Sequence, residues 1–462
     1  MTSVTNVIGP GGQLYADPQP TPGEVTFRQD NTSAAYYTSP YYLAHRNQVR
    51  AIPPRRNTAA VQLSNFLPAD VIAAITGAGS ISFHAAGDTG AAKVNRSQTV
   101  ATAIGNEAHV ADGMATEVRT QGTSGPAFLF ILGDVIYNFG EAQYYYDQLY
   151  EPYRGYDRPI FAIPGNHDAM VFGPTSTAPQ NVSLGAFQAN FCAAAPGPSP
   201  DAPGIMRSVM TQPGVYFTLD APFVSVIGLY SNVLEGPGVI SSQSGRYPVS
   251  DEQLAFLQSE LSRLKPDRVA NRRAIVLAVH HPPLSVDAVH GGSTGLQADL
   301  DSCCAAAGLF PDVVLSGHAH LYQRYKHVTT TGQEIPYIVS GSGGFSATAP
   351  MTKPPPVGTT IGPDTLIVGP IVQFGYLTVS TDATHLSVTF NTSVGGVTAQ
   401  ADSVTVDLLQ GKIVTAAATA RLRKAAAARA KARAAKRPNP KSSVTLPRGR
   451  DRPRQKLKKP RR

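Results

Sequence analysis

The chain has 462 residues, of which 42% are hydrophobic and 15% are charged, and this composition is typical of globular rather than disordered or coiled-coil proteins. Its three cysteines, two of them adjacent, argue against a disulfide framework. The net charge of +8 combines a basic segment from residue 412 onward, with 19 Lys and Arg against one acidic residue, and a preceding part with 20 basic and 30 acidic residues. Any polyanion-binding property is therefore expected in the C-terminal segment.

The chain begins MTSVTNVIGPGGQLYADPQP, which lacks the basic and apolar regions of a secretory signal. No run of about eighteen apolar residues occurs, so we expect a cytoplasmic protein without a transmembrane segment, with export by a signal-free route left open. Residues 1–78 are rich in Pro, Tyr, Asn and Thr and contain one helix-like piece, PADVIAAITGAG. They are predicted to form an N-terminal extension packed on a main domain of residues 79–411.

From residue 79 onward, short apolar runs alternate with helical patterns, which indicates stacked β-α units. The runs are SISFHAAGD, PAFLFILGD, PIFAIPGNHD, FVSVIGLYSN, AIVLAVHHPP, DVVLSGHAH and IPYIVSGSGG. Residues 249–264, VSDEQLAFLQSELSRL, have leucines at helical spacing, and Ser250 with Gln253 fits a capping box, so a helix is predicted. The segments FGYLTVSTDATHLSVTFNT and DSVTVDLL alternate in polarity and predict closing antiparallel strands.

Five of these runs end at residue types that bind metals. The residues are Asp88, Asp134, Asn166 with His167, His280, and His318 with His320. A Gly-Asp pair after a strand is commonly only a turn or a helix cap. However, the loops at the carboxyl ends of strands in an α/β sheet converge on one crevice, so five such clusters in order favour one shared metal site.

The series GDTG, GDVIY, GNHD, HHPP and GHAH resembles the calcineurin-like metallophosphoesterase superfamily, and specifically its purple-acid-phosphatase-like branch, over roughly residues 79–345. The resemblance implies a four-layer α/β/β/α sandwich of two mixed β-sheets flanked by helices. It also implies hydrolysis of phosphate monoesters by a hydroxide held at two metal ions. Phosphodiesters or nucleotides are the alternative substrates.

The resemblance also implies the metal ligands. Most superfamily members open with Asp-x-His, but Gly90 stands at the histidine position here. Purple acid phosphatases fill this gap with the tyrosine of Gly-Asp-x-x-Tyr, which is the spacing of Gly133, Asp134 and Tyr137. The implied ligands are Asp88, Tyr137 and His320 for the first metal, Asn166, His280 and His318 for the second, and Asp134 as the bridge. A phenolate suits ferric iron, so the first metal is expected to be Fe(III) and the second divalent Fe, Zn or Mn.

Three further residues are implied by the resemblance. His167 is expected to face the phosphate or the leaving group, Asp168 to orient its imidazole, and His290 to face the substrate. His281 competes with His280 as a ligand, but the pattern His-x-Pro selects His280. His84 is interpreted as a core histidine.

The C-terminal segment ARLRKAAAARAKARAAKR and the residues after it combine dense positive charge with few large apolar side chains. Residues 412–462 are therefore predicted to be a disordered basic tail. Such a tail either is solvated without a function or binds nucleic acid, polyphosphate or an anionic membrane face without sequence specificity. A third function hypothesis follows, namely a nucleic-acid-associated protein that acts through this tail and has a vestigial metal site.

Overall fold

The computed structural model describes residues 7–8, 14–15, 17–28, 40–45, 51–91, 99–170, 182–231, 236–270, 272–345, 351 and 353–415. The chain divides into two units, Met1–Val414 and Thr415–Arg462. The predicted basic tail, apart from its first residues up to Thr415, lies outside the described residues.

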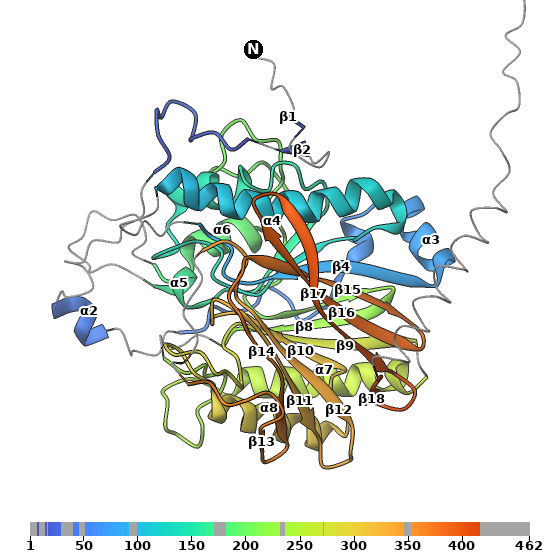
Figure 1. Ribbon diagram of the computed structural model, residues 1–462. Coiled ribbons are helices and arrows are strands. Elements are labelled where there is room, and N and C mark those ends of the chain that lie inside the picture. Colours follow the sequence, from blue (N-terminus) through green and yellow to red (C-terminus); the bar gives the residue numbers. More distant parts are fainter. Residues whose placement is uncertain are drawn as a thin grey trace, which may run out of the picture. The chain divides into compact units, whose positions relative to one another are not determined.

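Two mixed β-sheets form the centre of the first unit (Figure 1). The nine-stranded sheet contains, in spatial order, β13 (Thr360–Ile361), β14 (Asp364–Ile371), β11 (Tyr322–Val328), β12 (Glu334–Ser340), β10 (Val313–Ser316), β9 (Arg273–Val279), β8 (Phe223–Leu229), β7 (Phe217–Ala221) and β3 (Val61–Gln62). The seven-stranded sheet contains β18 (Lys412–Ile413), β17 (Val397–Asp407), β16 (His385–Val394), β15 (Gly375–Asp382), β4 (Ser80–Ala86), β5 (Leu129–Ile131) and β6 (Ile160–Ala162). A separate hairpin pairs β1 (Val7–Ile8) with β2 (Leu14–Tyr15).

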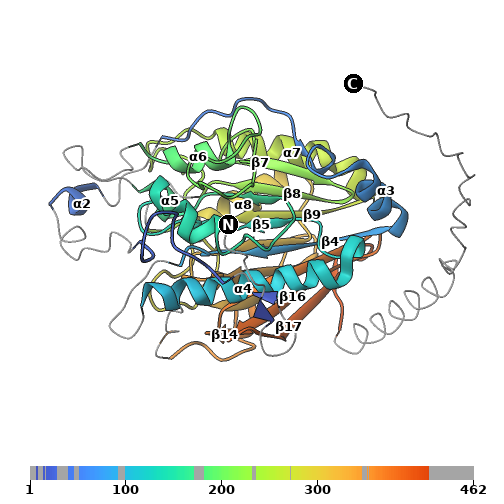
Figure 2. The same cartoon turned by 90° about the horizontal axis from the view of Figure 1, so that it is seen from above.

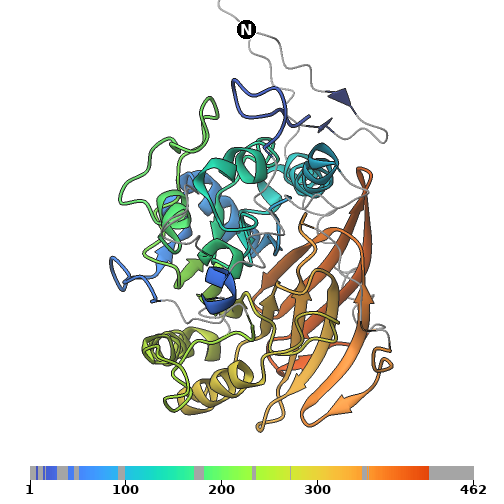
Figure 3. The same ribbon diagram turned by 90° about the vertical axis from the view of Figure 1, so that its left-hand side faces the viewer.

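Helices cover the outer faces of both sheets. Helix α4 (Val100–Gln121) contacts β15, β16 and β17, whereas α7 (Glu252–Val269) contacts β8 and β9 and packs on α8 (Thr294–Ala307). Figures 1 and 2 show α4 and α7 on opposite sides of the strands, and Figure 3 shows the yellow-green α7 beside the golden-yellow α8. The predicted α/β/β/α sandwich is confirmed.

The inner faces of the sheets share one apolar core. Phe83 of β4 stacks on Phe128 at 4.6 Å between ring centroids, and Phe130 of β5 stacks on Phe217 of β7 at 5.9 Å. Valine, leucine and isoleucine side chains from β8, β9, β10, β15 and β16 complete this core. Removing this apolar surface from water is the main driving force that holds the two sheets face to face.

The predicted strands are present, and the two helix-like segments form helices at Ala69–Ala78 and Glu252–Val269. The seven apolar runs contain β4, β5, β6, β8, β9, β10 and β12, in that order. Strands β15, β16 and β17 are antiparallel neighbours, as their alternating polarity predicts. The remaining short elements are α2 (Pro40–His45), η1 (Leu63–Asn65), α3 (Ala69–Ala78), η2 (Gly122–Ser124), η3 (Ala142–Tyr144), η4 (Tyr146–Tyr150), α5 (Asn166–Ala169) and α6 (Gly185–Phe191). No helix among the described residues is both long enough and apolar enough to cross a membrane.

The start of α7 differs from the sequence prediction. Asp251, not Ser250, is the N-cap residue, and no side-chain cap bond forms there. Gln253 is buried and is bonded to the Tyr230 main chain, accepting from the amide at 2.8 Å and donating to the carbonyl at 2.7 Å. The predicted capping box is therefore wrong, because a tertiary contact with the end of β8 takes the side chain that the box would have used.

Residues beyond both ends of the predicted main domain pair with strands of its sheets. Within the predicted extension, β3 pairs with β7, and the Asp147 carboxylate of η4 accepts hydrogen bonds from the Thr21 and Arg28 amides at 3.1 and 2.9 Å. At the other end, β18 pairs with β17 just beyond residue 411. The division at residues 78 and 411 stays a prediction, and a truncation that spares the sheet belongs after Thr415.

A buried carboxyl group on α4 yields a testable effect on stability. Glu107 is fully buried, its Oε2 accepts from the Ala91 amide at 3.2 Å, and its Oε1 has no hydrogen-bond partner among the described residues. Burial raises the pKa of Glu107 well above its ordinary value of 4.5, and the Ala91 bond opposes this only in part. Between the ordinary and the raised pKa, the folded protein therefore keeps a proton that the unfolded chain releases. The contribution of Glu107 to the free energy of unfolding is therefore highest below its ordinary pKa and falls as the pH rises.

We expect Glu107→Gln to raise the free energy of unfolding at pH 8 by about 1 kcal/mol or more, because glutamine resembles the protonated acid and never has to bind a proton. At pH 4.5 the gain should be smaller. Denaturant unfolding of the metal-free protein at both pH values measures the difference. Glu24→Gln, at an exposed glutamate, is the control and should change neither value. A larger gain at pH 4.5 than at pH 8 would contradict the assignment.

Candidate metal centre

The side chains at the ends of five strands meet in one place. Asp88 follows β4, Asp134 follows β5, Asn166 begins α5 after β6, His280 follows β9, and His318 follows β10. Together with Tyr137 and His320, they make up the seven side chains predicted as ligands, and all seven are buried. The two sheets thus bring together residues that are far apart in the sequence.

One group of donor atoms surrounds the Tyr137 hydroxyl. Its Oη atom lies 2.9 Å from Asp88 Oδ1, 2.9 Å from Asp134 Oδ2 and 3.2 Å from His320 Nε2. His320 Nε2 is also 3.3 Å from Asp88 Oδ1. These are the residues predicted for the first metal, together with the predicted bridge.

A second group surrounds the Asn166 side-chain oxygen. Asn166 Oδ1 lies 3.1 Å from His280 Nε2 and 3.0 Å from His318 Nδ1. His280 Nε2 lies 3.3 Å from Asp134 Oδ2, and one donor atom each from Asp134, His280 and His318 can be chosen so that all lie within 4.8 Å of one another. Asp134 Oδ2 therefore belongs to both groups.

The spacing of these atoms fits metal coordination. Adjacent ligands at about 2.0–2.1 Å from one ion stand about 2.9–3.4 Å apart in octahedral or tetrahedral geometry. Neighbouring donor atoms in the first group, from Asp88, Asp134, Tyr137 and His320, lie 2.9–3.3 Å apart. In the second group, Asn166 Oδ1 lies 3.1 Å from His280 and 3.0 Å from His318, and Asp134 Oδ2 is 3.3 Å from His280 Nε2. Carboxylate, phenol, amide and imidazole donors could therefore hold two ions that share one oxygen.

The electrostatics of the cluster are those of a site built for cations. Burial and then the charges of Asp134 and Asp88 raise the pKa of Tyr137 well above its ordinary value. Burial favours the neutral form of Asp134, but His280 and His167 outweigh it and hold that pKa below its usual range. Burial opposes the charge on His280, yet Asp134 raises its pKa to about 9. Tyr137 thus stays neutral and adds no further negative charge, and protonated His280 offsets part of the charge of the buried carboxylates; a bound cation would replace both protons.

Backbone geometry sets the direction of three of these side chains. Asp88, Asp134 and His318 have φ values of 58°, 52° and 68°, in the left-handed region that non-glycine residues rarely adopt. Each turn is tight, and a Cβ atom at Gly165 would overlap the Asp134 side chain. Such strain is tolerated where the surrounding structure fixes the turn, and it is often found at functional sites.

The structure also accounts for the glycine at the position where most superfamily members have a histidine. A Cβ atom on Gly90 would lie 2.5 Å from the Val135 carbonyl oxygen and 2.7 Å from Gln148 Oε1. No larger side chain fits there without displacing this backbone. Tyr137 reaches the first donor group from the neighbouring loop instead.

His167 and Asp168 lie beside this cluster with different partners. His167 Nδ1 is 2.7 Å from the Asn138 carbonyl oxygen, and its ring is 4.4 Å from that of Tyr137. The Asp168 carboxylate accepts from the amides of Gly165 at 2.8 Å and of Val135 at 3.1 Å. The carbonyl of Asn138 therefore orients the ring of His167, and Asp168 binds the loops on either side of it. Burial and the nearby Asp134 charge raise the pKa of Asp168 to about 7.

His290 lies over the second donor group. Its ring is 4.4 Å from His318 and 5.5 Å from His320, and its Nδ1 is 2.8 Å from the Asp287 carboxylate. His281 points elsewhere, with Nδ1 3.0 Å from Ser231 Oγ, and it is His280 that contacts Asn166 and Asp134. Asp287 is a neighbour of the site that the sequence analysis missed.

Two further residues missed by the sequence analysis contact Tyr137. Gln148 in η4 is hydrogen-bonded to the Tyr137 amide and carbonyl, and Phe345, directly after the glycine-rich run at the end of β12, stacks on its ring. The glycines in GSGGF indicate a close approach of backbone, but no local pattern identifies its partner. Phenylalanine has no donor atom, and both polar atoms of the Gln148 side chain bond the Tyr137 main chain, so a search for ligands does not find these residues.

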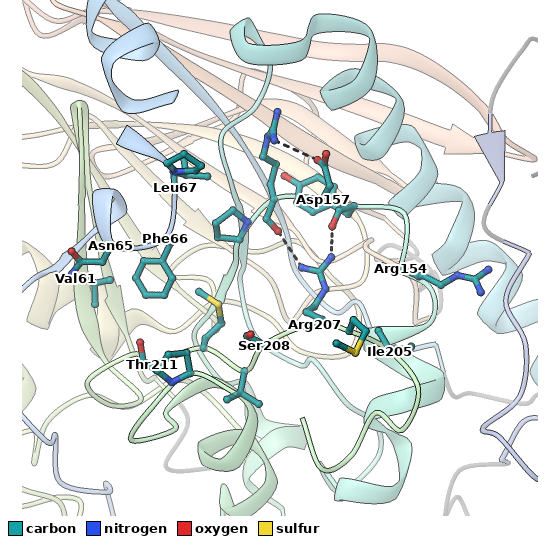
Figure 4. Close-up of a pocket in the computed structure, with 18 of the residues that line it drawn as sticks. Val61, Asn65, Phe66, Leu67, Arg154, Asp157, Ile205, Arg207, Ser208 and Thr211 are labelled. Carbon is teal, nitrogen blue, oxygen red and sulfur yellow. Dashed lines mark hydrogen bonds and ion pairs between the residues drawn. The ribbon is translucent and has the colours of Figure 1, made fainter. Parts of the chain in front are cut away.

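A separate groove of about 1010 Å³ lies elsewhere on the first unit (Figure 4). It is lined by residues from 57–71, 146–159 and 196–213, including Pro159 directly before β6. Asn166 follows the opposite end of that strand, and none of the predicted ligands lines the groove. Arg207, at its wall, donates to the Arg158 carbonyl at 3.1 Å and so ties two of its segments together.

One family model matches the part of the chain that contains the site. The model of the calcineurin-like phosphoesterase family matches residues 86–322, which include all seven predicted ligands. None of the curated proteins compared with the chain matches it. Among solved structures, purple acid phosphatase PPD1 from yellow lupin (Lupinus luteus) seeds is 14% identical with a TM-score of 0.49, covering 77% of this chain and 55% of its own. PhoD is 12% identical with a TM-score of 0.44, covering 79% of this chain and 73% of its own.

A dimetal phosphatase from Danio rerio is 12% identical, with a TM-score of 0.41, and the match covers 71% of this chain and 99% of that one. The match to the lupin protein covers 55% of that protein, so this chain spans only about half of its length.

Proposed function

This chain belongs to the calcineurin-like phosphoesterase family, and we propose that it is a metal-dependent phosphoesterase that hydrolyses phosphate monoesters. The observation that carries the proposal is the position of Asp134 Oδ2. This atom lies 2.9 Å from Tyr137 Oη in one donor group and 3.3 Å from His280 Nε2 in the other. One carboxylate oxygen thus lies close to both groups of donor atoms.

Seven side chains would hold the metal pair. We infer that Asp88, Tyr137 and His320 bind the first ion, Asn166, His280 and His318 bind the second, and Asp134 bridges them. When bound, two such ions supply positive charge that stabilises the oxygens of an in-line displacement and activate a water molecule. The phenolate of Tyr137 favours Fe(III) at the first position, and the N and amide donors of the second position suit divalent Fe, Zn or Mn.

The neighbouring histidines supply the proton chemistry in this proposal. The Nδ1 atom of His167 donates to the Asn138 carbonyl, and we assign to its Nε2 atom the exchange of a proton with the leaving oxygen of the ester. His290 is held in the same way through Nδ1 by Asp287. Contacts at Nδ1 thus orient the rings of both histidines.

Metal analysis together with two chromogenic substrates tests the proposal. Purified protein should contain close to two metal ions per chain and should hydrolyse p-nitrophenyl phosphate faster than bis(p-nitrophenyl) phosphate. Faster hydrolysis of the diester would favour the alternative of a phosphodiesterase or nucleotide hydrolase. Protein that binds metal but hydrolyses neither ester would refute the proposed activity.

We expect Tyr137→Phe to remove a visible absorption band from protein reconstituted with iron. A phenolate bound to ferric iron gives a ligand-to-metal charge-transfer band, and phenylalanine has no oxygen to provide it. Absorption spectra of the two proteins at equal iron content measure the effect. Tyr150→Phe, which removes a buried hydroxyl bonded to Asn190 instead, is the control and should keep the band. A colourless but active iron-containing wild type would argue against Tyr137 as a ligand.

The C-terminal tail is proposed to bind polyanions independently of the metal centre. Because 19 basic residues lie from residue 412 onward, and all but Lys412 lie beyond Thr415, full-length protein should bind DNA with an affinity that falls steeply as salt rises. Protein that ends at Thr415 should bind far more weakly and keep its activity on a small monoester. Fluorescence anisotropy with labelled DNA at several salt concentrations measures the first effect. Equal binding by both proteins would place the basic surface elsewhere.

A further inference from the structure

The ring of Phe345 lies flat on the ring of Tyr137. The ring centroids are 3.7 Å apart and the planes differ by 8°, and both side chains are buried. His320 stands edge-to-face on the same phenyl ring at 4.7 Å and 77°. One phenyl group therefore contacts two of the three residues that we assign to the first metal alone.

The loop that carries Phe345 is hydrogen-bonded to the turn that carries Asp88, the third residue assigned to the first metal. The Phe345 amide donates to the Asp88 carbonyl at 3.0 Å, and the Gly343 amide donates to the Gly87 carbonyl at 2.9 Å. A Cβ atom at Gly343 or Gly344 would collide with the turn at Thr89, so only glycine permits this approach. The position of the phenyl ring is thus fixed relative to Asp88.

Tyr137 has two kinds of support. Gln148 accepts from the Tyr137 amide at 2.8 Å and donates to its carbonyl at 2.9 Å, which holds the main chain. These bonds do not reach the side chain, which is held at its hydroxyl by Asp88 and Asp134 and at its ring by its aromatic neighbours. Phe345 covers one face of the phenol ring, and His167 lies 4.4 Å from the ring of Tyr137.

We propose that Phe345 is a positioning residue for the first metal site, and that it holds the Tyr137 phenol and the His320 imidazole in the orientation that coordination requires. The inference rests on the proposed role of Tyr137 as a ligand. Stacking keeps Tyr137 Oη at 2.9 Å from both Asp88 Oδ1 and Asp134 Oδ2 and excludes water from one face of the phenolate. Residues that orient metal ligands in this way tune both the affinity and the electronic properties of a site.

The test compares Phe345→Leu and Phe345→Met, which lack the ring, with Phe345→Tyr, which keeps it. We expect the two ring-less variants to bind the first metal about 10- to 100-fold more weakly, the range that follows loss of an orienting partner. Their phenolate-to-iron band should shift and broaden, whereas Phe345→Tyr should restore the wild-type spectrum and affinity. Chelator competition with zinc measures affinity, and absorption of iron-loaded protein measures the band.

Phe390→Leu is the matched control. Phe390 stacks on Tyr322 at 4.1 Å and 8° in the core between the sheets, and Tyr322 is not one of the predicted ligands. Its loss should lower thermal stability and leave the band and the zinc affinity unchanged. If Phe390→Leu lost as much zinc affinity as the Phe345 variants, general destabilisation would explain both losses and the inference would be overturned.

Failure of this inference is distinguishable from failure of the proposed function. If the wild-type protein shows no band, Tyr137 is not a ligand of the first metal. The zinc affinities of the ring-less variants would then test whether Phe345 positions His320 alone. Wild-type protein with the band, and ring-less variants with the same band and the same zinc affinity, would leave the proposed function intact and refute the inference. Weaker zinc binding in the ring-less variants alone supports it.

Discussion

Asp134→Asn is expected to lower phosphate-ester hydrolysis by at least about 10³-fold and to reduce the content of both metals, because one oxygen of this carboxylate serves both donor groups. The amide keeps the size of the side chain and removes the negative charge. It also places a possible N–H donor against His280, where the structure has an acceptor. Metal analysis and hydrolysis of p-nitrophenyl phosphate measure the two losses.

Asp220→Asn is the control for loss of a buried carboxylate. Asp220 lies in β7, is paired with Arg263 at 3.0 Å, and contacts none of the predicted ligands. It should cost stability without changing metal content. If Asp134→Asn kept two metals and near-wild-type turnover, the two-metal interpretation would be wrong.

His167→Ala should lower turnover by about 10²–10⁴-fold, as expected for a lost acid-base group, while metal content stays at the wild-type level. The imidazole is held by the Asn138 carbonyl at 2.7 Å and lies beside Tyr137, so its removal takes away a proton donor but no predicted ligand. Steady-state kinetics and metal analysis of the same preparation measure both quantities.

The comparison with His290→Ala assigns the roles of the two histidines. His385→Ala, at the start of β16 with Nδ1 2.8 Å from Thr384 Oγ1, is the control for loss of a histidine outside the site. Metal loss in His167→Ala would make His167 a ligand. An unchanged rate in His167→Ala with a reduced rate in His290→Ala would transfer the acid role to His290.

The sequence by itself determined where the seven apolar runs lie along the chain and which of their last residues cluster, whereas Tyr137 was found through the family resemblance. Apolar runs that end in Asp, Asn or His mark the carboxyl ends of β4, β5, β6, β9 and β10, and such ends converge in an α/β fold. The spacing of Asp134 and Tyr137 likewise places both side chains on one short loop. These features are local in sequence, so pattern alone is enough to find them.

The tertiary structure alone decided how the cluster is supported. Gln253 does not form the predicted capping box because its side chain bonds the main chain at the end of β8. Gly90 must be glycine because the Val135 carbonyl and the Gln148 side chain occupy the space that a Cβ atom would need. Phe345 reaches Tyr137 only through the pairing of its loop with the Asp88 turn. Such contacts join segments from different strands and different sheets. Their energies depend on the relative positions of those segments, which no short stretch of sequence specifies.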